Sequence, residues 1–210
     1  MTAGRFISFE GGEGSGKSTQ LRRLATALGG RGISCVLTRE PGGSPGAEQI
    51  RRLLVEGATG RWQPMTEALL HYAARVEHVT RTIRPALARG DWVLSDRFAD
   101  STLAYQGYGH ALGAEAIAAL HRLALGDMRP DLTLIFDLPV AEGLARAKAR
   151  GGAEDRYERM DFGFHERLRQ GFLAIAAAEP ERCVLIEAGG SVEAVGARTW
   201  SAVATRFGLS

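Results

Sequence analysis

Short apolar runs alternate with longer amphipathic stretches along the chain, and each short run is a candidate β-strand. Five such runs begin at Phe6, Ile33, Trp92, Leu132 and Cys183. Between the first two, leucine and alanine recur every three or four residues until Gly29 and Gly30, which predicts a helix that ends there. A strand, a helix and a second strand form the unit of a parallel sheet. The pattern predicts an α/β fold whose five-stranded parallel sheet is flanked by helices.

The later amphipathic stretches predict further helices. Apolar residues spaced by three and four from Met65 to Leu87 indicate one long helix, with Pro85 near its end. A second stripe on another face of that helix consists of His71, Arg75, His78 and Thr82. A solvated helix face explains such a stripe without any ligand. More helices are predicted at 161–179 and 192–207, and we expect a single domain over residues 1–210.

The first predicted strand runs into a glycine-rich loop with the pattern Gly11-x-x-x-x-Gly16-Lys17-Ser18. Glycines let backbone N–H groups turn toward phosphate oxygens, and the following helix points the positive end of its dipole at the same anion. Lys17 adds a mobile positive charge, and the Ser18 hydroxyl is the expected Mg²⁺ ligand. The predicted site for a nucleoside triphosphate consists of Gly11, Gly12, Glu13, Gly14, Ser15, Gly16, Lys17, Ser18 and Thr19.

Charged residues follow the second and third strands, at the edge where a parallel sheet opens onto its ligand crevice. Arg39 lies in the breaker-rich segment 38–46, and an ordinary solvated loop charge explains it equally well. Asp96 and Arg97 end the third strand. Asp96 is a candidate to hold the water shell of Mg²⁺, and an ion pair between Asp96 and Arg97 at a turn is the alternative.

An arginine-rich polar segment follows the fourth strand. Arg146 and Arg150 lie four residues apart on one helix face, before the pair Gly151-Gly152 and the arginine Arg156. A glycine-hinged segment of this kind is typical of a lid that closes cations onto a triphosphate. We expect this lid at about 148–160, although a solvated charged surface has the same composition.

Composition narrows the class of protein. The 210 residues include 26 lysines and arginines against 24 aspartates and glutamates, so no basic excess is available to neutralise a nucleic-acid backbone. No apolar run reaches the roughly 18 residues of a membrane span, and no signal-peptide pattern is present. We expect a cytoplasmic protein that binds neither nucleic acid nor membrane. Cys35 and Cys183 are expected to be reduced core residues.

Four motifs, taken together, resemble one family over essentially the whole chain. They are 9–18, Thr38-Arg39-Glu40-Pro41-Gly42-Gly43, the helical segment 67–75, and 96–107, of which the last is the most diagnostic. In these motifs the chain is similar to the bacterial thymidylate kinases. The resemblance implies a three-layer P-loop kinase fold with a small arginine-rich lid. It also implies transfer of the γ-phosphoryl group of ATP to thymidine 5′-monophosphate (dTMP), with Mg²⁺.

The resemblance implies roles in holding the acceptor phosphate and sugar. Arg39 and Arg97 would hold the acceptor phosphate, and Glu13 would lie near the sugar 3′-hydroxyl. The peptide bond before Pro41 would be cis, which helps to aim the neighbouring arginine. Tyr105 would pack where a ribose 2′-hydroxyl would clash, because an aromatic wall rejects an added hydroxyl by shape.

The resemblance also implies how the base is read. Arg75 would donate to a thymine carbonyl, since a planar donor fork suits that group. Thr102 and Gln106 would help to read the base, and Ser101 belongs to the same predicted substrate site.

Two features depart from the pattern of many relatives. Where those relatives have an aromatic residue four positions before the arginine that matches Arg75, this chain has His71, followed by Tyr72. On a helix both lie within about 60° of Arg75, so either is a candidate to stack on the base. The glycine-rich loop also contains no basic residue before Lys17.

Because the glycine-rich loop contains no arginine, we expect the lid to supply the further positive charge at the transferred phosphate. Lys17 and Arg97 are predicted to neutralise the transferred group together with a lid arginine. Arg156 is the first choice for that arginine and Arg150 the second, with Arg146 assigned to ATP.

The sequence leaves other functions open. A kinase for another nucleotide or for a nucleoside is one, and Glu10 would be the base for a hydroxyl acceptor. A P-loop module that binds nucleotide without catalysis is another. Relatives form dimers through helices, so a homodimer is expected. The helix that begins at Met65 is a candidate interface, although an ordinary core face explains its apolar stripe equally well.

Overall fold

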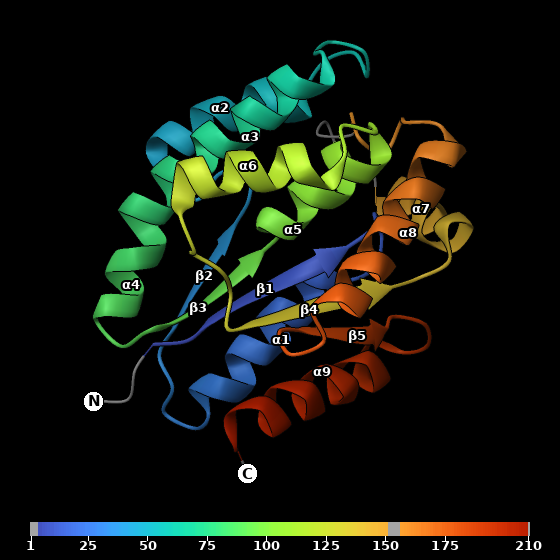
Figure 1. Ribbon diagram of the computed structural model, residues 1–210. Coiled ribbons are helices and arrows are strands. Elements are labelled where there is room, and N and C mark those ends of the chain that lie inside the picture. The colour runs from blue at the N-terminus through green and yellow to red at the C-terminus, as the bar shows by residue number, and fades with distance from the viewer. Residues whose placement is uncertain (1–3, 151–155, 210) are drawn as a thin grey trace.

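Five parallel strands form one sheet at the centre of the structure, in the order β2-β3-β1-β4-β5 (Figure 1). The structure is a computed structural model, which describes residues 4–150 and 156–209. The strands are β1 (Phe6–Gly11), β2 (Cys35–Arg39), β3 (Trp92–Asp96), β4 (Leu132–Asp137) and β5 (Cys183–Glu187). The predicted parallel sheet is confirmed, and the second strand lies two residues later than its apolar run indicates.

Helices connect the strands and cover both faces of the sheet. They are α1 (Lys17–Gly29), α2 (Pro45–Val55), α3 (Pro64–His78), α4 (Arg84–Ala88), α5 (Ala99–Thr102), α6 (Ala114–Leu125), α7 (Val140–Arg150), α8 (Phe162–Ala178) and α9 (Val192–Phe207). Two π-helical turns, η1 (Val79–Ile83) and η2 (Leu103–Gly109), continue α3 and α5.

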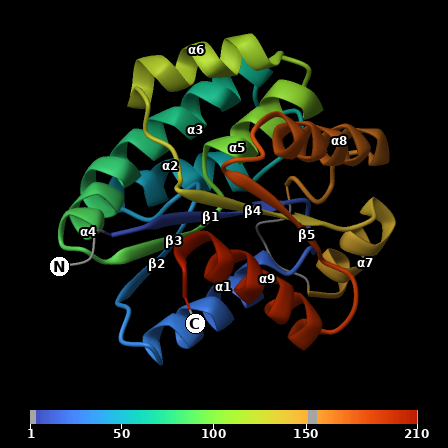
Figure 2. The same cartoon turned by 60° about the horizontal axis from the view of Figure 1, so that its bottom comes forward.

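The sheet lies between two helical layers, each with its own apolar core (Figure 2). On one face α1 packs against β1 and β3, and α9 packs against β4 and β5, in a core that includes Leu24, Val203 and Phe9. On the other face lie α3 to α6 and α8, whose clusters include Phe98 and Phe172. The central strand β1 is buried along its whole length, including its polar residues Ser8 and Glu10.

Two helical segments differ from the sequence prediction. The stretch predicted as one helix at 65–87 is divided into α3, η1 and α4. Pro85 has no N–H to donate to the preceding turn, and the wider η1 turn lies directly before it. Helix α2 begins at Pro45, inside the segment predicted as a loop, because proline fits the first turn of a helix, where no N–H donor is needed.

The glycine-rich loop packs directly against α7. Gly14 has a φ of +66°, and a Cβ atom there would lie 2.0 Å from the carbonyl oxygen of Gly143. A Cβ atom on Gly143 would in turn lie 2.5 Å from the carbonyl oxygen of Glu13. Only glycine therefore allows the two backbones to approach so closely.

Three other predictions concern the covalent state, the membrane and the lid. Cys35 and Cys183 are free, as predicted. Within 4–150 and 156–209, no helix has the length and apolar character that a bilayer span requires. Of the predicted lid at 148–160, residues 151–155 and the side chain of Arg150 lie outside the described part of the chain.

We predict that Gly143→Ala destabilises the protein and displaces the glycine-rich loop. Overpacking of this kind costs about 1–3 kcal/mol, which corresponds to a fall in Tm of about 2–12 °C for a chain of this size. Thermal unfolding followed by circular dichroism measures the change. Gly29→Ala is the matched control, because Gly29 is also helical but has no atom within 4 Å of the added Cβ. A Tm for Gly143→Ala equal to that of the control would contradict the prediction.

Candidate active site

A cavity of about 570 Å³ opens at the carboxyl edge of the sheet. The glycine-rich loop forms one side, the ends of β2 and β3 form the floor, and α3 and η2 form the other side. The structure thus brings together most of the residues predicted from sequence. Those that line the cavity are Glu13, Gly14, Ser15, Gly16, Lys17, Ser18, Thr19, Arg39, Pro41, His71, Asp96, Arg97, Ser101, Tyr105 and Gln106.

Lys17 lies folded over the glycine-rich loop. Its Nζ donates to the carbonyl oxygens of Gly11 and Gly12, at 3.0 and 2.6 Å, and to Ser15 Oγ at 3.1 Å. Burial and the nearby charge of Arg97 lower the pKa of Lys17 to about 8. The loop therefore holds its cation in a ring of oxygens that a phosphate group can replace.

Ser18 and Asp96 come from different elements and meet at the cavity wall. Ser18, in the first turn of α1, donates a hydrogen bond to the Asp96 carboxylate at the end of β3. A hydroxyl and a carboxylate are hard oxygen donors of the kind that Mg²⁺ prefers, usually together with phosphate oxygens and water. The described residues contain no cluster of three or more His, Cys, Asp or Glu side chains that could hold a metal alone. The pair therefore fits a cation shared with a bound phosphate.

Arg97 is held in a left-handed backbone conformation, with a φ of +73°. Its guanidinium donates to the Gly11 carbonyl at 2.9 Å, to Ser101 Oγ at 3.1 Å and to Glu13 Oε1 at 3.1 Å. Tyr105 donates its hydroxyl to the same Glu13 oxygen at 2.5 Å. Burial alone would raise the pKa of Glu13, but Arg97, Lys17 and Tyr105 lower it to about 2. Glu13 is therefore ionised and aligns Arg97 and Tyr105 along the cavity.

Glu10 lies in the core and contacts the segment that follows Arg97. Its carboxyl group accepts a hydrogen bond from Phe98 N at 2.7 Å, and its other oxygen lies 2.5 Å from Ser101 Oγ. Burial, reinforced by the charge of Asp100, raises the pKa of Glu10 to about 8. Glu10 is fully buried, and its two oxygens hold the Phe98 backbone and the Ser101 side chain, both of which follow Arg97. This arrangement gives no support to Glu10 as a general base.

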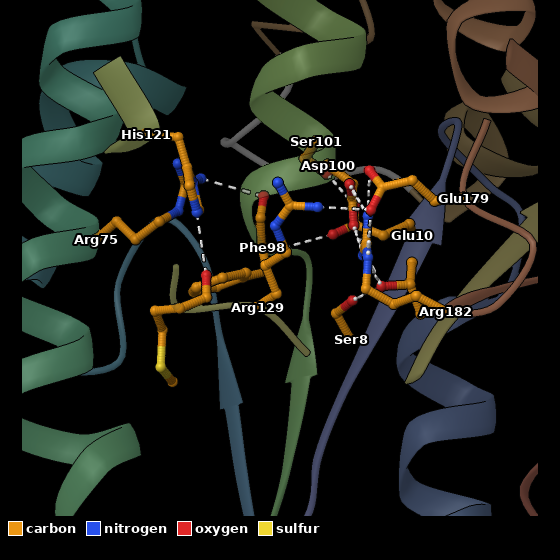
Figure 3. A network of polar contacts seen from close by, with 12 residues as sticks. Ser8, Glu10, Arg75, Phe98, Asp100, Ser101, His121, Arg129, Glu179 and Arg182 are labelled. Carbon is orange, nitrogen blue, oxygen red and sulfur yellow. Dashed lines mark hydrogen bonds and ion pairs between the residues drawn. The ribbon is translucent and has the colours of Figure 1, made fainter. Parts of the chain in front are cut away.

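A second ion pair, between Arg182 and Asp100, connects the segment that follows Arg97 to the edge of the sheet formed by β5 (Figure 3). Arg182, the residue directly before β5, donates to both oxygens of Asp100 at 2.7 and 2.9 Å and to Thr133 Oγ1 at 2.6 Å. Thr133 in turn lies 2.9 Å from Ser8 of β1. The segment that carries Arg97 and Ser101 is thus tied to β1, β4 and β5.

Arg75 lies buried beside the cavity. Its Nε donates to Glu40 at 2.6 Å, and its Nη2 donates to Thr102 Oγ1 at 2.9 Å and to the Phe98 carbonyl at 3.1 Å. Its Nη1 is also buried, and no atom of the described residues accepts a hydrogen bond from it. One donor of this guanidinium therefore remains available. The peptide bond between Glu40 and Pro41 is cis, as predicted.

Gln106 has a buried hydrogen-bond acceptor without a partner, whereas Arg75 has a buried donor. Its Nε2 donates to the Glu67 carboxylate at 2.7 Å. Because a carboxylate only accepts, this contact orients the amide and points Oε1 the other way. That Oε1 is buried and has no donor among the described residues. Gln106 lines the cavity and follows Thr102, the acceptor of Arg75, by four residues, whereas Arg75 itself is buried behind the described cavity wall.

The structure distinguishes His71 from Tyr72. His71 lines the cavity, and its Nε2 lies 2.9 Å from the hydroxyl of Tyr157. Burial lowers the pKa of His71 to about 4, so its ring is neutral at physiological pH. Tyr72 turns instead into the apolar cluster with Ala68 and Ile117. Of the two, His71 is the one that lines the cavity, and its contact with a base stays a prediction.

Two of the predicted lid arginines, Arg146 and Arg156, lie outside the described cavity wall. Arg156 is only 1% exposed and pairs with Glu67 rather than lining the described cavity wall. Arg146 pairs with Glu142 on the surface of α7, with 2.5 Å between the charged groups. The role assigned to Arg156 at the transferred phosphate has no support from this arrangement and stays a prediction. The roles of Arg146 and Arg150 likewise stay predictions.

Sequence reasoning missed several residues of the cavity wall, including Arg22, Arg51, Val55 and Tyr157. Arg22 follows Ser18 by four residues on α1, so helical spacing alone could have identified it. Arg51 and Val55 belong to α2, which the sequence pattern did not predict. Arg51 donates to the Pro41 carbonyl at 2.6 Å and so supports the turn next to Arg39.

Comparisons with known proteins agree with this geometry. A family model described as thymidylate kinase matches residues 9–198. The thymidylate kinase of Caulobacter vibrioides is 60% identical over 209 residues, which cover 100% of both chains. That of Rhodopseudomonas palustris (strain BisB18) is 53% identical and covers 98% of this chain and 91% of its own. The crystal structure of thymidylate kinase from Ehrlichia chaffeensis superposes with a TM-score of 0.77 at 35% identity, over 96% of this chain and 99% of that one.

The family match spans nearly the whole chain and includes the glycine-rich loop, both strand-end arginines and the segment with Tyr105 and Gln106. The fold and the relatives therefore lead to the same conclusion. This chain belongs to the thymidylate kinase family.

Proposed function

We propose that the protein transfers the γ-phosphoryl group of ATP to dTMP, giving thymidine diphosphate and ADP. The observation that carries this proposal is the pair of unpartnered groups beside the cavity, the Arg75 Nη1 donor and the Gln106 Oε1 acceptor. Thymine presents a carbonyl acceptor next to its N3–H donor, which complements the pair. Cytosine presents an amino donor next to an acceptor nitrogen, which would leave both protein groups unpaired.

The acceptor phosphate and sugar occupy the opposite end of the cavity. Arg97 and Arg39 hold the phosphate, because two guanidinium groups match its charge and geometry. Glu13 accepts from the sugar 3′-hydroxyl, and Tyr105, held by Glu13 at 2.5 Å, packs where a 2′-hydroxyl would project. His71 contacts the base as a neutral ring.

ATP binds on the glycine-rich loop at the N-terminus of α1, with Lys17 moving from its loop carbonyls to the phosphate oxygens. Ser18 and Asp96 would hold Mg²⁺, which neutralises phosphate charge when bound. Transfer is in line, and the acceptor phosphate oxygen is already anionic, so no side chain needs to remove a proton. The protein contributes position and charge, mainly through Lys17 and Arg97.

We place this reaction in the cytoplasm, where ATP is available. The nearly balanced charge of the chain supports a protein that acts on small nucleotides rather than nucleic acid.

A homodimer through α3 and α6 is part of the proposal. Exposed apolar side chains gather on these two neighbouring helices: Met65, Leu69 and Val76 on α3, and Leu123 on α6. Leu123 is 86% exposed and Leu69 51%. A surface of this kind is typical of an interface between subunits.

Replacing Lys17 tests the phosphate assignment. We predict that Lys17→Ala lowers kcat on the order of a thousandfold, because the migrating phosphoryl group loses its mobile cation. A coupled ADP-release assay with ATP and dTMP measures the change, and circular dichroism verifies the fold. Arg23→Ala is the control, since Arg23 is on the same helix but pairs with Glu193 at the surface. Near-normal turnover by folded Lys17→Ala would contradict the assignment.

Replacing Gln106 tests the reading of the base. We predict that Gln106→Leu raises KM for dTMP about tenfold, the cost of one lost hydrogen bond, and leaves KM for ATP unchanged. Gln20→Leu is the matched control, because Gln20 is also buried, donates through Nε2 to a carbonyl and has an unpartnered Oε1, but lies outside the described cavity wall.

The same assay with a panel of monophosphates tests the substrate. The unmodified protein is expected to use dTMP faster than dCMP, dAMP or dGMP. Equal rates with dTMP and dCMP would refute the base-reading proposal.

The dimer is tested by sedimentation at micromolar concentration. We predict that the unmodified protein sediments as a dimer and that Leu69→Glu sediments as a monomer, because a charge cannot be buried unpaired in the interface. Leu185→Glu, at an exposed apolar position on β5, is expected to remain dimeric. A monomeric unmodified protein would refute the interface.

A further inference from the structure

Arg156 is buried, and it donates hydrogen bonds to backbone carbonyls in the segment that runs from the end of α2 toward α3. Its Nη1 donates to the Leu54 carbonyl at 3.0 Å, its Nε to the Ala58 carbonyl at 3.0 Å and its Nη2 to the Thr59 carbonyl at 2.9 Å. The same Nη2 lies 2.5 Å from Glu67 Oε2 on α3. We call this set of contacts the Arg156 anchor. It connects the segment before α8 to the end of α2 and the start of α3.

Glu67, the acidic member of the anchor, is itself 1% exposed. Burial alone would raise its pKa, but the nearby His110 and the charge of Arg156 lower it to about 2. Gln106 donates to the other oxygen of this carboxylate. A buried, ionised Glu67 therefore needs its cation, and withdrawing Arg156 would leave that charge poorly compensated.

The residue next to Arg156 forms part of the cavity wall. Tyr157 lines the cavity, and its hydroxyl lies 2.9 Å from His71 Nε2. Its ring meets the Tyr105 ring edge to face, with centroids 5.2 Å apart. Tyr157 thus lies against the two residues proposed to contact the base and the sugar. The Arg159 guanidinium also donates to the Gly57 carbonyl at 2.6 Å, so the segment has a second, exposed contact with the same loop.

Each nitrogen of the Arg156 guanidinium makes at least one of these contacts, whereas other cations border the cavity directly. Lys17, Arg97, Arg22 and Arg39 all line it. To reach a phosphate, Arg156 would have to release three carbonyls and a buried carboxylate at once, and each lost charge-assisted bond is costly. The geometry favours a residue that holds structure near the acceptor.

We propose that Arg156 is a positioning residue that fixes Tyr157 as the wall of the acceptor pocket and thereby controls affinity for the nucleoside monophosphate. This proposal rests on the proposed dTMP kinase function. It assigns to Arg156 a task different from stabilising the transferred phosphate. Because the anchor joins α2, α3 and the segment before α8, the shape of the base and sugar pocket depends on a residue that does not touch the substrate.

A positioning role and a catalytic role of Arg156 predict different kinetic effects of Arg156→Met. Loss of the anchor raises KM for dTMP about tenfold and leaves kcat within about threefold and KM for ATP unchanged. Calorimetric titration of dTMP without ATP shows the same tenfold loss of affinity, which a residue acting only in the transition state would not cause. A fall in kcat on the order of a thousandfold with unchanged dTMP affinity would overturn the proposal in favour of the catalytic role.

Two further variants keep the test decisive if Arg156→Met fails to fold. Arg156→Lys retains a charge beside Glu67 but cannot reach three carbonyls, and it is expected to weaken dTMP binding in the same direction. Tyr157→Ala leaves the anchor intact and is expected to reproduce the rise in KM for dTMP. Unchanged dTMP affinity in Tyr157→Ala would overturn the proposal.

Arg206→Met serves as the control, because Arg206 donates to a single carbonyl, that of Asp131, at the surface. It is expected to change neither KM. The unmodified protein's turnover of dTMP is measured in the same series, so a failure of the proposed function is distinguished from a failure of the proposed role for Arg156.

Discussion

A buried positive charge needs a buried negative partner, and this constraint organises the carboxyl edge of the sheet. Among the described residues, four arginines with little or no exposure each pair with an acid from another element: Arg75 with Glu40, Arg97 with Glu13, Arg156 with Glu67, and Arg182 with Asp100. Such a pair adds little net stability, but losing one partner is costly. The pairs therefore fix the relative positions of segments that are distant in sequence.

Whether the N–H donors of a buried arginine all have acceptors indicates whether the arginine holds structure or is available for substrate. Arg182 and Arg156 give their donors to carboxylates, hydroxyls or carbonyls, and both hold structure. Arg75 keeps one buried donor without a described acceptor, which supports a contact with substrate. Arg97 shares its donors with Glu13 and Ser101 at the cavity wall. The same residue type thus supports either architecture or recognition, according to how completely its partners satisfy it.

The residues proposed for selectivity and those proposed for catalysis lie in different parts of the cavity. The proposed base-reading groups lie on α3 and η2, whereas the phosphate-binding groups lie on the glycine-rich loop and the ends of β2 and β3. Glu13 connects the two regions, because Arg97 and Tyr105 both donate to one of its oxygens. In the proposed function, binding of the acceptor sugar and alignment of the acceptor phosphate therefore depend on the same carboxylate.

The sequence by itself determined the strands, the glycine-rich loop, most helices and most residues of the cavity wall. These features depend on local periodicity and on backbone chemistry that a short motif specifies. Only the tertiary structure decided which of His71 and Tyr72 lines the cavity, since both lie within about 60° of Arg75 on an isolated helix and Tyr72 packs against Ile117. It also placed Arg156 beside Glu67, because the partners of a buried charge come from distant segments that no local pattern relates.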